Sequence, residues 1–290
     1  MNTFDWQALT PVERNLAFNN RAHVGAEFAI QKNDGWAAES ATLRQQRPTH
    51  LDLPYGSGER EKWDLYPAAN PLAPCFVHIH GGYWQRGSKE IFACMAQGVL
   101  AHGWSAALPG YTLAPDASLS QIVDALHQAL DWFAVNASAH GILGPLVLTG
   151  WSAGAHLAAC LIDHPAVVAG MSISGVFDLA PLRQAPHVND LVKLSDHEVA
   201  TLSPLRSAPS SKRLSIAYGT GERPAMVAAS RDFNAMRAAA HCPGDLIPIV
   251  AANHFTILDQ LRVADSHLVQ SIIGLVPDAR GGVARNTQRI

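Results

Sequence analysis

Cysteine, net charge and long apolar runs are all scarce in this chain of 290 residues. Its four cysteines stand far apart with no CxxC pair, which excludes a disulfide scaffold and predicts free thiols in a reducing compartment. With 21 basic and 24 acidic residues, the net charge of −3 gives no electrostatic footprint for nucleic acid or an anionic membrane. No apolar run approaches the roughly 18 residues of a membrane span, and no signal-peptide pattern opens the sequence. We therefore expect a cytoplasmic protein without nucleic-acid or membrane partners.

Apolar residues are plentiful, at 48% against 16% charged, which excludes disorder and predicts a large buried core. We expect one domain over residues 1–290. Residues 1–50 are polar and are expected to form a helical extension packed on the main domain. The tail 277–290 holds almost no apolar residues and is expected to fray.

Short apolar runs bounded by Gly or Pro alternate with segments of helical spacing. The predicted strands are Lys62–Tyr66, Cys75–Ile79, Trp104–Leu108, Leu146–Thr149, Gly170–Ile173, Leu214–Tyr218 and Leu246–Val250. The predicted helices are Leu119–Phe133 with Ser118 as its cap, Ala155–Ile162, Pro224–Ala240 and Thr256–Ile273. This alternation predicts an α/β fold with a mostly parallel sheet and helices on both faces. The stretch Leu179–Ser211, with four prolines, interrupts the alternation of strands and helices and is expected to form a small cap.

A G-x-S-x-G element occurs at Gly150-Trp151-Ser152-Ala153-Gly154, between a predicted strand and a predicted helix. This is the strand–turn–helix context that a nucleophilic serine requires. Glycine is needed on both sides because the sharp turn brings neighbouring backbone close. The following helix directs its amide groups and positive dipole end at the serine. The element predicts Ser152 as a nucleophile, with an ordinary structural turn as the alternative.

Two glycines follow the predicted strand Cys75–Ile79, in the segment His80-Gly81-Gly82-Tyr83-Trp84. Such a loop turns backbone N–H groups toward a cavity, where they stabilise the oxyanion that forms when a serine attacks a carbonyl. We expect the amides of Gly82 and Tyr83 to do this, together with the amide of Ala153 after the nucleophile. An ordinary Gly-Gly turn is the alternative, and the G-x-S-x-G element disfavours it.

A histidine base and an acid should follow the serine along the chain. His254 comes after the last predicted strand, whereas the other late histidines, His241 and His267, lie on the ends or faces of predicted helices. Glu222 is the one carboxylate on the loop after Leu214–Tyr218 and is expected to orient the imidazole. Asp232 and Asp245 remain open as alternative acids.

Aromatic side chains flank these elements and are predicted to line a substrate pocket: Tyr83, Trp84, Trp151, Phe177 and Phe255. Core packing is the alternative for each, above all for the two tryptophans. His78 and His80 could face one metal ion, but no third ligand has a suitable spacing. We therefore expect His78 to be a core histidine and His80 to belong to the oxyanion loop, with no metal and no other cofactor.

With these residues placed, the chain resembles the α/β-hydrolases, and more narrowly the kynurenine formamidases and the related hormone-sensitive-lipase-type esterases. The resemblance covers about residues 15 to 275. It rests on His80-Gly81-Gly82-Tyr83-Trp84, Ser152-Ala153-Gly154-Ala155-His156, Gly175-Val176-Phe177-Asp178-Leu179, Glu222 with Pro224, and His254-Phe255. His156 is counted with the substrate-binding residues for its place in the serine motif. The family acid is usually Asp, and here it is Glu222.

The resemblance implies a metal-free hydrolase that uses Ser152, Glu222 and His254 through an acyl-enzyme. The expected substrate is a small molecule, a formamide or small acyl amide of an aromatic amine such as N-formylkynurenine. The alternatives are a carboxylesterase for short acyl esters and, more remotely, a non-catalytic binding protein on a hydrolase fold. A homodimer is left open.

Overall fold

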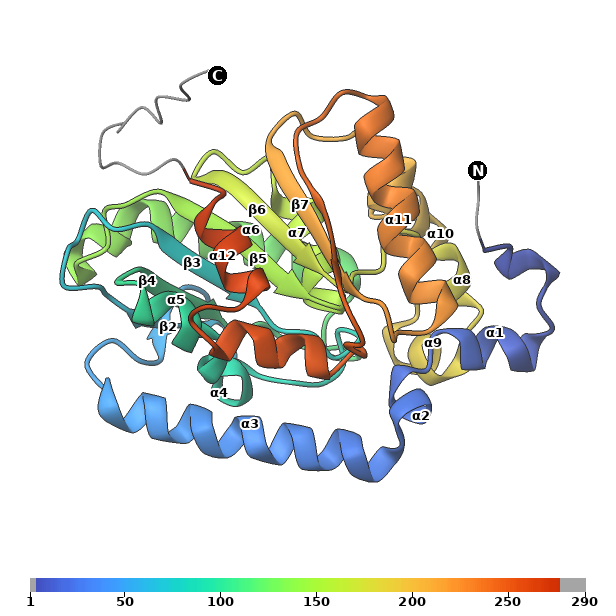
Figure 1. The fold of residues 1–290 in the computed structure, drawn as a ribbon, viewed down its shortest axis with the longest axis horizontal. Coiled ribbons are helices and arrows are strands. Elements are labelled where there is room, and N and C mark those ends of the chain that lie inside the picture. The colour runs from blue at the N-terminus through green and yellow to red at the C-terminus, as the bar shows by residue number, and fades with distance from the viewer. Residues whose placement is uncertain (1–3, 277–290) are drawn as a thin grey trace, which may run out of the picture.

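One eight-stranded sheet forms the centre of the protein in this computed structural model, which describes residues 4–276 (Figure 1). The predicted frayed tail, 277–290, lies outside the described residues. The strand order is β1-β2-β4-β3-β5-β6-β7-β8. The strands are β1 (Leu53–Pro54), β2 (Lys62–Tyr66), β3 (Cys75–Ile79), β4 (Ser105–Pro109), β5 (Leu146–Trp151), β6 (Val167–Ile173), β7 (Arg213–Gly219) and β8 (Leu246–Ile249).

The sheet is antiparallel between β1, β2 and β4 and parallel from β4 through β8. The predicted fold class, a mostly parallel sheet of an α/β protein, is therefore confirmed. Every residue of β3, β4 and β5 is buried, because helices cover both faces of these strands. Parallel strands place their carboxyl ends at one edge, so loops after β3, β5, β6, β7 and β8 converge there.

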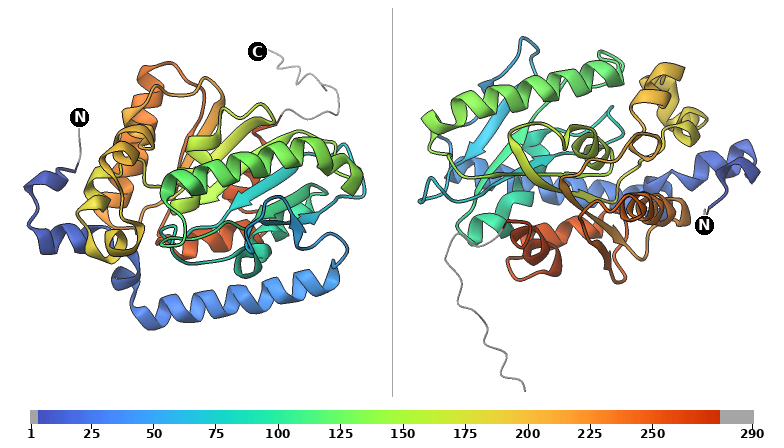
Figure 2. Two further views of the ribbon diagram at one scale, coloured as in Figure 1. Left: turned by 180° about the vertical axis from the view of Figure 1, so that it is seen from behind. Right: turned by 90° about the horizontal axis from the view of Figure 1, so that it is seen from above.

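Two hydrophobic cores lie on the two faces of the sheet. One packs under α6 (Leu119–Asn136), α7 (Ala153–Leu161) and α11 (Pro224–Ala239). The other packs under α3 (Ala26–Gln46), α5 (Gln97–Ala101) and α12 (His267–Ile273). Figure 2 shows α6 and α12 on opposite sides of the strands. Ser118 caps α6 as predicted, accepting a hydrogen bond from the backbone of Gln121.

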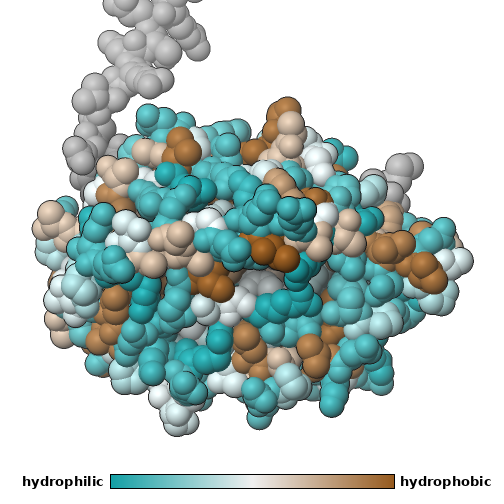
Figure 3. Space-filling view, turned by 90° about the horizontal axis from the view of Figure 1, so that it is seen from below, coloured by the Kyte–Doolittle hydropathy of each residue, from teal (hydrophilic) through white to brown (hydrophobic). Residues whose placement is uncertain are grey.

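The N-terminal extension is helical, as expected. Its elements are η1 (Trp6–Ala8), α1 (Pro11–Ala17), α2 (Asn20–Val24) and α3. Trp36 of α3 is fully buried against Trp151 and Phe255, with ring centroids 6.0 and 6.2 Å away. Figure 3 shows the molecule from below as largely teal, with brown residues in small separate groups.

The stretch 179–211 forms four short segments beside α11 (Figure 1): α8 (Ala180–Arg183), α9 (Pro186–Val192), α10 (Asp196–Thr201) and η4 (Pro204–Arg206). Several of their apolar side chains are buried in the first core, and Leu182 and Val188 are fully buried there. The remaining elements are α4 (Lys89–Phe92), η2 (Ala93–Ala96), η3 (Ala137–His140) and η5 (Thr256–Arg262). No helix within residues 4–276 has the length and apolar character that a bilayer span requires.

The prediction of one continuous helix over Thr256–Ile273 is wrong. The segment forms the 3₁₀ helix η5 and then, after a break, α12. The break has a local cause at Ser266, whose hydroxyl donates to Gln260 O and accepts from Val269 N, so it ends one turn and caps the next.

Candidate active site

Ser152 stands on a sharp turn between β5 and α7, with φ 57° and ψ −117°. This backbone conformation is strained for a residue with a side chain, and such strain is typical of functional turns. The flanking glycines are required by close approach. A Cβ on Gly150 would lie 2.1 Å from Gly154 O, and one on Gly154 would lie 2.0 Å from Ile79 O. The turn therefore presents Ser152 at the carboxyl edge of the sheet.

Three side chains from separate loops form one hydrogen-bonded chain at this edge. Ser152 Oγ lies 2.9 Å from His254 Nε2, and His254 Nδ1 lies 2.9 Å from Glu222 Oε2. The His254 and Glu222 side chains are only 3% and 0% exposed, so water does not compete for these bonds. A carboxylate on Nδ1 fixes the proton there and leaves Nε2 free to accept the serine proton.

Glu222 is the carboxylate that contacts His254 among the three acids considered from the sequence. Its other oxygen, Oε1, accepts hydrogen bonds from Gly219 N and Ser174 Oγ, both at 2.6 Å. Asp245 lies at the start of β8 with a side chain 64% exposed and pairs with Arg213 at 3.1 Å. Asp232 lies on α11 and lines a different cavity.

Ser174 was not identified from the sequence. It follows β6 directly, with φ 53°, and its hydroxyl is fully buried against Glu222. Its position at the end of a strand beside the nucleophile strand was the available signal.

The loop that carries His254 is held from both sides of the histidine. Trp151 Nε1 donates to His254 O at 2.9 Å. Asn253 Oδ1 accepts from the backbone N–H groups of Phe255 and Thr256, both at 2.9 Å. The histidine is thus placed by its own loop and by the residue that precedes the nucleophile.

The predicted oxyanion loop follows β3 and turns sharply, with φ 120° at Gly82 and 52° at Tyr83. A Cβ on Gly82 would lie 2.2 Å from Arg86 O, so only glycine fits there. Within residues 4–276, no acceptor is found for the backbone N–H groups of Gly82, Tyr83 or Ala153. Unpaired amides on the two loops around a serine are the groups that an oxyanion requires.

A cavity of about 270 Å³ opens over Ser152 and His254. Of the predicted pocket residues, Tyr83, Trp151 and Phe255 line it. Its wall also includes Asn20, Arg21, Ala29 and Asn33 from the N-terminal extension and Arg86 from the oxyanion loop. Sequence reasoning gave the extension only a packing role, because its contacts with the site are long-range and leave no periodic pattern.

Three predicted pocket residues do not line this cavity, which corrects the expectation for Trp84, His156 and Phe177. Trp84 and His156 pack edge-to-face in the core with centroids 5.1 Å apart. Burial lowers the pKa of His156 to about 4, so this ring is neutral. Phe177 stacks on Phe233 at 4.1 Å, away from the serine. Core packing, the alternative for these aromatic residues, holds for Trp84 and Phe177.

His78 and His80 are core side chains in this structure. His78 Nδ1 lies 3.0 Å from Thr149 Oγ1, and His80 Nδ1 lies 2.9 Å from Gly81 O. Burial lowers the pKa of His78 to about 3 and that of His80 to about 4. Through its hydrogen bond to Gly81 O, His80 fixes the backbone of the oxyanion loop.

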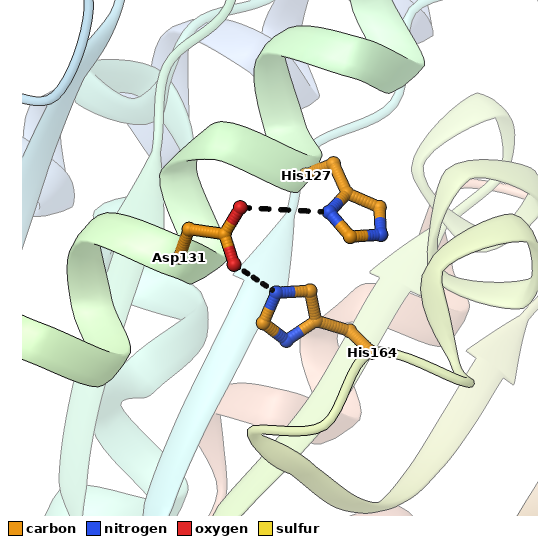
Figure 4. Close-up of side chains that lie close together, drawn as sticks. All are labelled: His127, Asp131 and His164. Carbon is orange, nitrogen blue, oxygen red and sulfur yellow. Dashed lines mark hydrogen bonds and ion pairs between the residues drawn. The ribbon is translucent and has the colours of Figure 1, made fainter.

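A different group, His127, Asp131 and His164, brings three side chains of metal-ligating type together within residues 4–276 (Figure 4). Asp131 Oδ1 lies 3.1 Å from His164 Nε2, and Oδ2 lies 3.8 Å from His127 Nδ1. However, His164 Nδ1 accepts a hydrogen bond from Ala166 N at 3.2 Å. A neutral His164 therefore carries its proton on Nε2, where a metal would need a lone pair.

Known proteins that are similar to this chain include hydrolytic enzymes. A family model described as BD-FAE matches residues 64–163. A kynurenine formamidase of Salmo salar is 29% identical over 91% of this chain and 95% of that protein. One of Danio rerio is 26% identical over 93% of this chain and 97% of that protein.

Solved structures show the same fold. A Silicibacter protein proposed to be a thioesterase has a TM-score of 0.78 and 30% identity, covering 89% of this chain and 97% of that one. The esterase LipW of Mycobacterium marinum has a TM-score of 0.68 at 17% identity, covering 94% and 97%.

Proposed function

We propose that this chain, which belongs to the α/β-hydrolase family and is similar to the kynurenine formamidases, hydrolyses a formamide or small acyl amide of an aromatic amine. N-formylkynurenine is the substrate we would test first. The observation that carries the proposal is the buried Ser152–His254–Glu222 chain beneath a cavity edged by unpaired amides. Full-length similarity to kynurenine formamidases supports the substrate class.

The first chemical step transfers the proton of Ser152 Oγ to His254 Nε2 as Oγ attacks the carbonyl carbon. The imidazolium that forms is stabilised by Glu222, whose charge is held in place by Gly219 N and Ser174 Oγ. The carbonyl oxygen becomes an oxyanion, and the amides of Gly82, Tyr83 and Ala153 donate to it.

Collapse of the tetrahedral intermediate breaks the C–N bond, and His254 gives its proton to the departing amine. A water then takes the place of the amine, and His254 removes its proton as it attacks the acyl-Ser152 ester. The product acid leaves, and Ser152 regains its proton. The Ala153 amide also benefits from the positive end of the α7 dipole.

The volume and the lining of the cavity support a substrate with a small acyl group on an aromatic amine. At about 270 Å³ it is close to the lower limit for pockets that bind small molecules. Trp151, Phe255 and Phe92 supply flat apolar walls for an aromatic ring.

Hydrolysis of short acyl esters is the second candidate function. The same residues would perform it with an alcohol as the leaving group. Its support is the set of solved esterases that share this fold. Fold likeness at such low identity does not select the substrate, so the two activities must be compared directly.

Cytoplasmic location is also part of the proposal. Its support is the state of the cysteines, since Cys75, Cys94, Cys160 and Cys242 are all unpaired. The homodimer remains a prediction, for which sedimentation of the purified protein is the direct test.

The deciding experiment measures kcat/KM for N-formylkynurenine and for p-nitrophenyl acetate on the purified protein, with Ser152→Ala as the control. A formamide value near or above about 10⁴ M⁻¹s⁻¹ that exceeds the ester value supports the proposal. Negligible formamide cleavage with rapid, Ser152-dependent ester cleavage would replace it with the esterase function.

A further inference from the structure

The short helix α2 brings a polar side chain with no partner to the wall of the cavity. Asn20 is its first residue and is only 4% exposed. Its Nδ2 and Oδ1 atoms are both buried, and neither has a hydrogen-bond partner within residues 4–276. A buried amide is normally paired, because leaving a donor and an acceptor unpaired destabilises the folded state. Asn20 therefore lies at the cavity wall although its unpaired amide lowers the stability of the folded state.

Hydrogen bonds hold this segment between the two loops of the site. The Tyr83 hydroxyl, on the oxyanion loop, donates to Phe18 O at 2.5 Å. On the loop that carries Glu222, Arg223 Nε donates to Asn19 O at 3.1 Å, and His23 Nε2 donates to Gly221 O at 3.2 Å. Asn20 is therefore anchored relative to the catalytic groups, and rotation about its terminal torsion can turn the amide toward a bound molecule.

Two arginines line the same cavity. Arg21 follows Asn20 on α2, and Arg86 lies on the oxyanion loop. Neither forms an ion pair with any residue in the described part of the chain, and the described cavity wall contains no Asp or Glu. The wall therefore attracts an anion, and a guanidinium fits the two oxygens of a carboxylate.

We propose that Asn20, Arg21 and Arg86 form a recognition subsite for a carboxylate of the substrate. This carboxylate belongs to the amine or alcohol portion, which is released when the acyl bond is cleaved. The inference rests on the proposed hydrolysis at Ser152 but applies to either an amide or an ester. The arginines supply the charge that draws the carboxylate into the cavity. The Asn20 amide completes the subsite by pairing with a polar group of the bound molecule.

The test compares substrates that differ only in charge. One pair is formanilide and formanilide with a carboxylate at each ring position in turn. The second pair is phenyl acetate and its ring-carboxylated analogues. The measured quantity is the ratio of kcat/KM for the carboxylated substrate to that for the neutral one.

We expect this ratio to exceed about ten for at least one ring position in the wild-type protein. Arg21→Gln and Arg86→Gln should each lower the ratio by ~5-fold, mainly through KM, because partly exposed ion pairs contribute modestly. Raising the salt concentration should also lower it. Arg47→Gln is the control, since it removes the same charge from the far end of α3. A ratio below one at every position, or an equal effect of Arg47→Gln, would overturn the proposal.

Asn20→Leu separates recognition from a structural role. Leucine has a similar size and leaves no buried donor or acceptor unpaired, so the melting temperature should stay the same or rise. The ratio of kcat/KM values should fall by ~5-fold or more. A lower melting temperature with an unchanged ratio would show that Asn20 is a structural residue and would remove it from the subsite.

The two substrate pairs keep this inference distinct from the proposed function. If only the esters are cleaved, the formamide proposal fails and the carboxylate ratio is still measured on the ester pair. If both are cleaved with no preference for the carboxylate, the hydrolase stands and the subsite fails.

Discussion

Two carboxylates are completely buried near opposite ends of the same sheet, and their partners differ. Glu222 follows β7 and contacts His254, the imidazole placed to accept the proton of Ser152. Asp64 lies on β2 and contacts Lys89 at 2.8 Å and Arg44, two basic side chains from other elements of the fold. A buried carboxylate beside a histidine and a serine can support proton transfer, whereas one between two basic side chains joins parts of the fold.

The Asp64 cluster joins elements that are distant in the sequence. Arg44 belongs to α3, and Lys89 begins α4 directly after the oxyanion loop. Lys89 also contacts Asp52 at 2.5 Å and Glu90 at 2.6 Å. Removing one member of a buried ion cluster leaves the others uncompensated, so this region should govern stability. Variants in the two regions should therefore separate activity from stability.

The largest expected effect is on activity, from Ser152→Ala. This change removes the attacking oxygen and should lower kcat by about 10³- to 10⁶-fold. The melting temperature should hold or rise, since the strained turn is unchanged and no buried contact except that to His254 is lost. Steady-state kinetics and thermal unfolding of the same preparation provide the measurement. Substantial remaining activity would contradict the assignment of Ser152.

Glu222→Gln should have the next largest effect on activity. The amide has nearly the same shape but no charge, so it cannot stabilise the imidazolium and favours the wrong tautomer of His254. We expect kcat to fall by about 10²- to 10⁴-fold. Asp245→Asn is the matched control, because that exposed carboxylate contacts Arg213 and not His254. A greater loss in Asp245→Asn than in Glu222→Gln would mean that the acid is misassigned.

Asp64→Asn should lower the stability of the fold and leave the activity nearly unchanged. Removing the charge between Lys89 and Arg44 should lower the free energy of unfolding by about 3 to 5 kcal/mol. The value of kcat per folded molecule should stay within about threefold of the wild type, because no member of the cluster lines the cavity. Denaturant unfolding and kinetics, normalised to the folded fraction, test both statements. A large loss of kcat without a loss of stability would break the distinction between the two regions.

The sequence was sufficient for the parts of this molecule that depend on local pattern. The strand Cys75–Ile79 has the predicted bounds, because a strand covered on both faces reads as an apolar run between turn residues. The strand Lys62–Tyr66, predicted after the turn Gly56-Ser57-Gly58, also has the predicted bounds. The glycine motif at Ser152 likewise specifies its own turn. The acid was harder, since the position of Glu222 on the loop after Leu214–Tyr218 favoured it but left Asp245 open. The contacts with Ser174 and His254 that decide between them appear in no local pattern.

Other features depended on tertiary contacts or fine geometry and were missed. The two-residue strand β1 is too short to show a period. Successive positive φ angles at Tyr83 and Trp84 turn the first ring toward the cavity and the second into the core. Asn20 and Arg21 reach the site only because α2 is held by Gly221 and Arg223, about 200 residues later in the chain.

The smallest expected effect is the pH dependence of the Asp64 cluster. Partial burial acts to raise the pKa of Glu90, but hydrogen bonds from Lys89 and Ser88 outweigh it and lower the pKa to about 2. The pKa of Asp52 is likewise lowered, against its burial, by Lys89 and Arg44. Because these values lie below those of the unfolded chain, the stabilisation is complete above about pH 4.5 and is lost as the pH falls toward 2.

Lys89→Met removes the shared partner of these two carboxylates and should lower the melting temperature at pH 7. The difference from the wild type should narrow as the pH falls from about 4.5 to 2, because the wild type then loses the stabilisation that the variant already lacks. Measuring the difference matters, because the buried His78 makes both proteins lose stability alike as the pH falls toward 3. Burial lowers its pKa to about 3, so the unfolded chain binds a proton there that the folded protein does not. A difference that stayed constant over this range would mean that Lys89 stabilises the fold by packing alone. The contrast with Glu222 would then rest on Arg44 and Asp64.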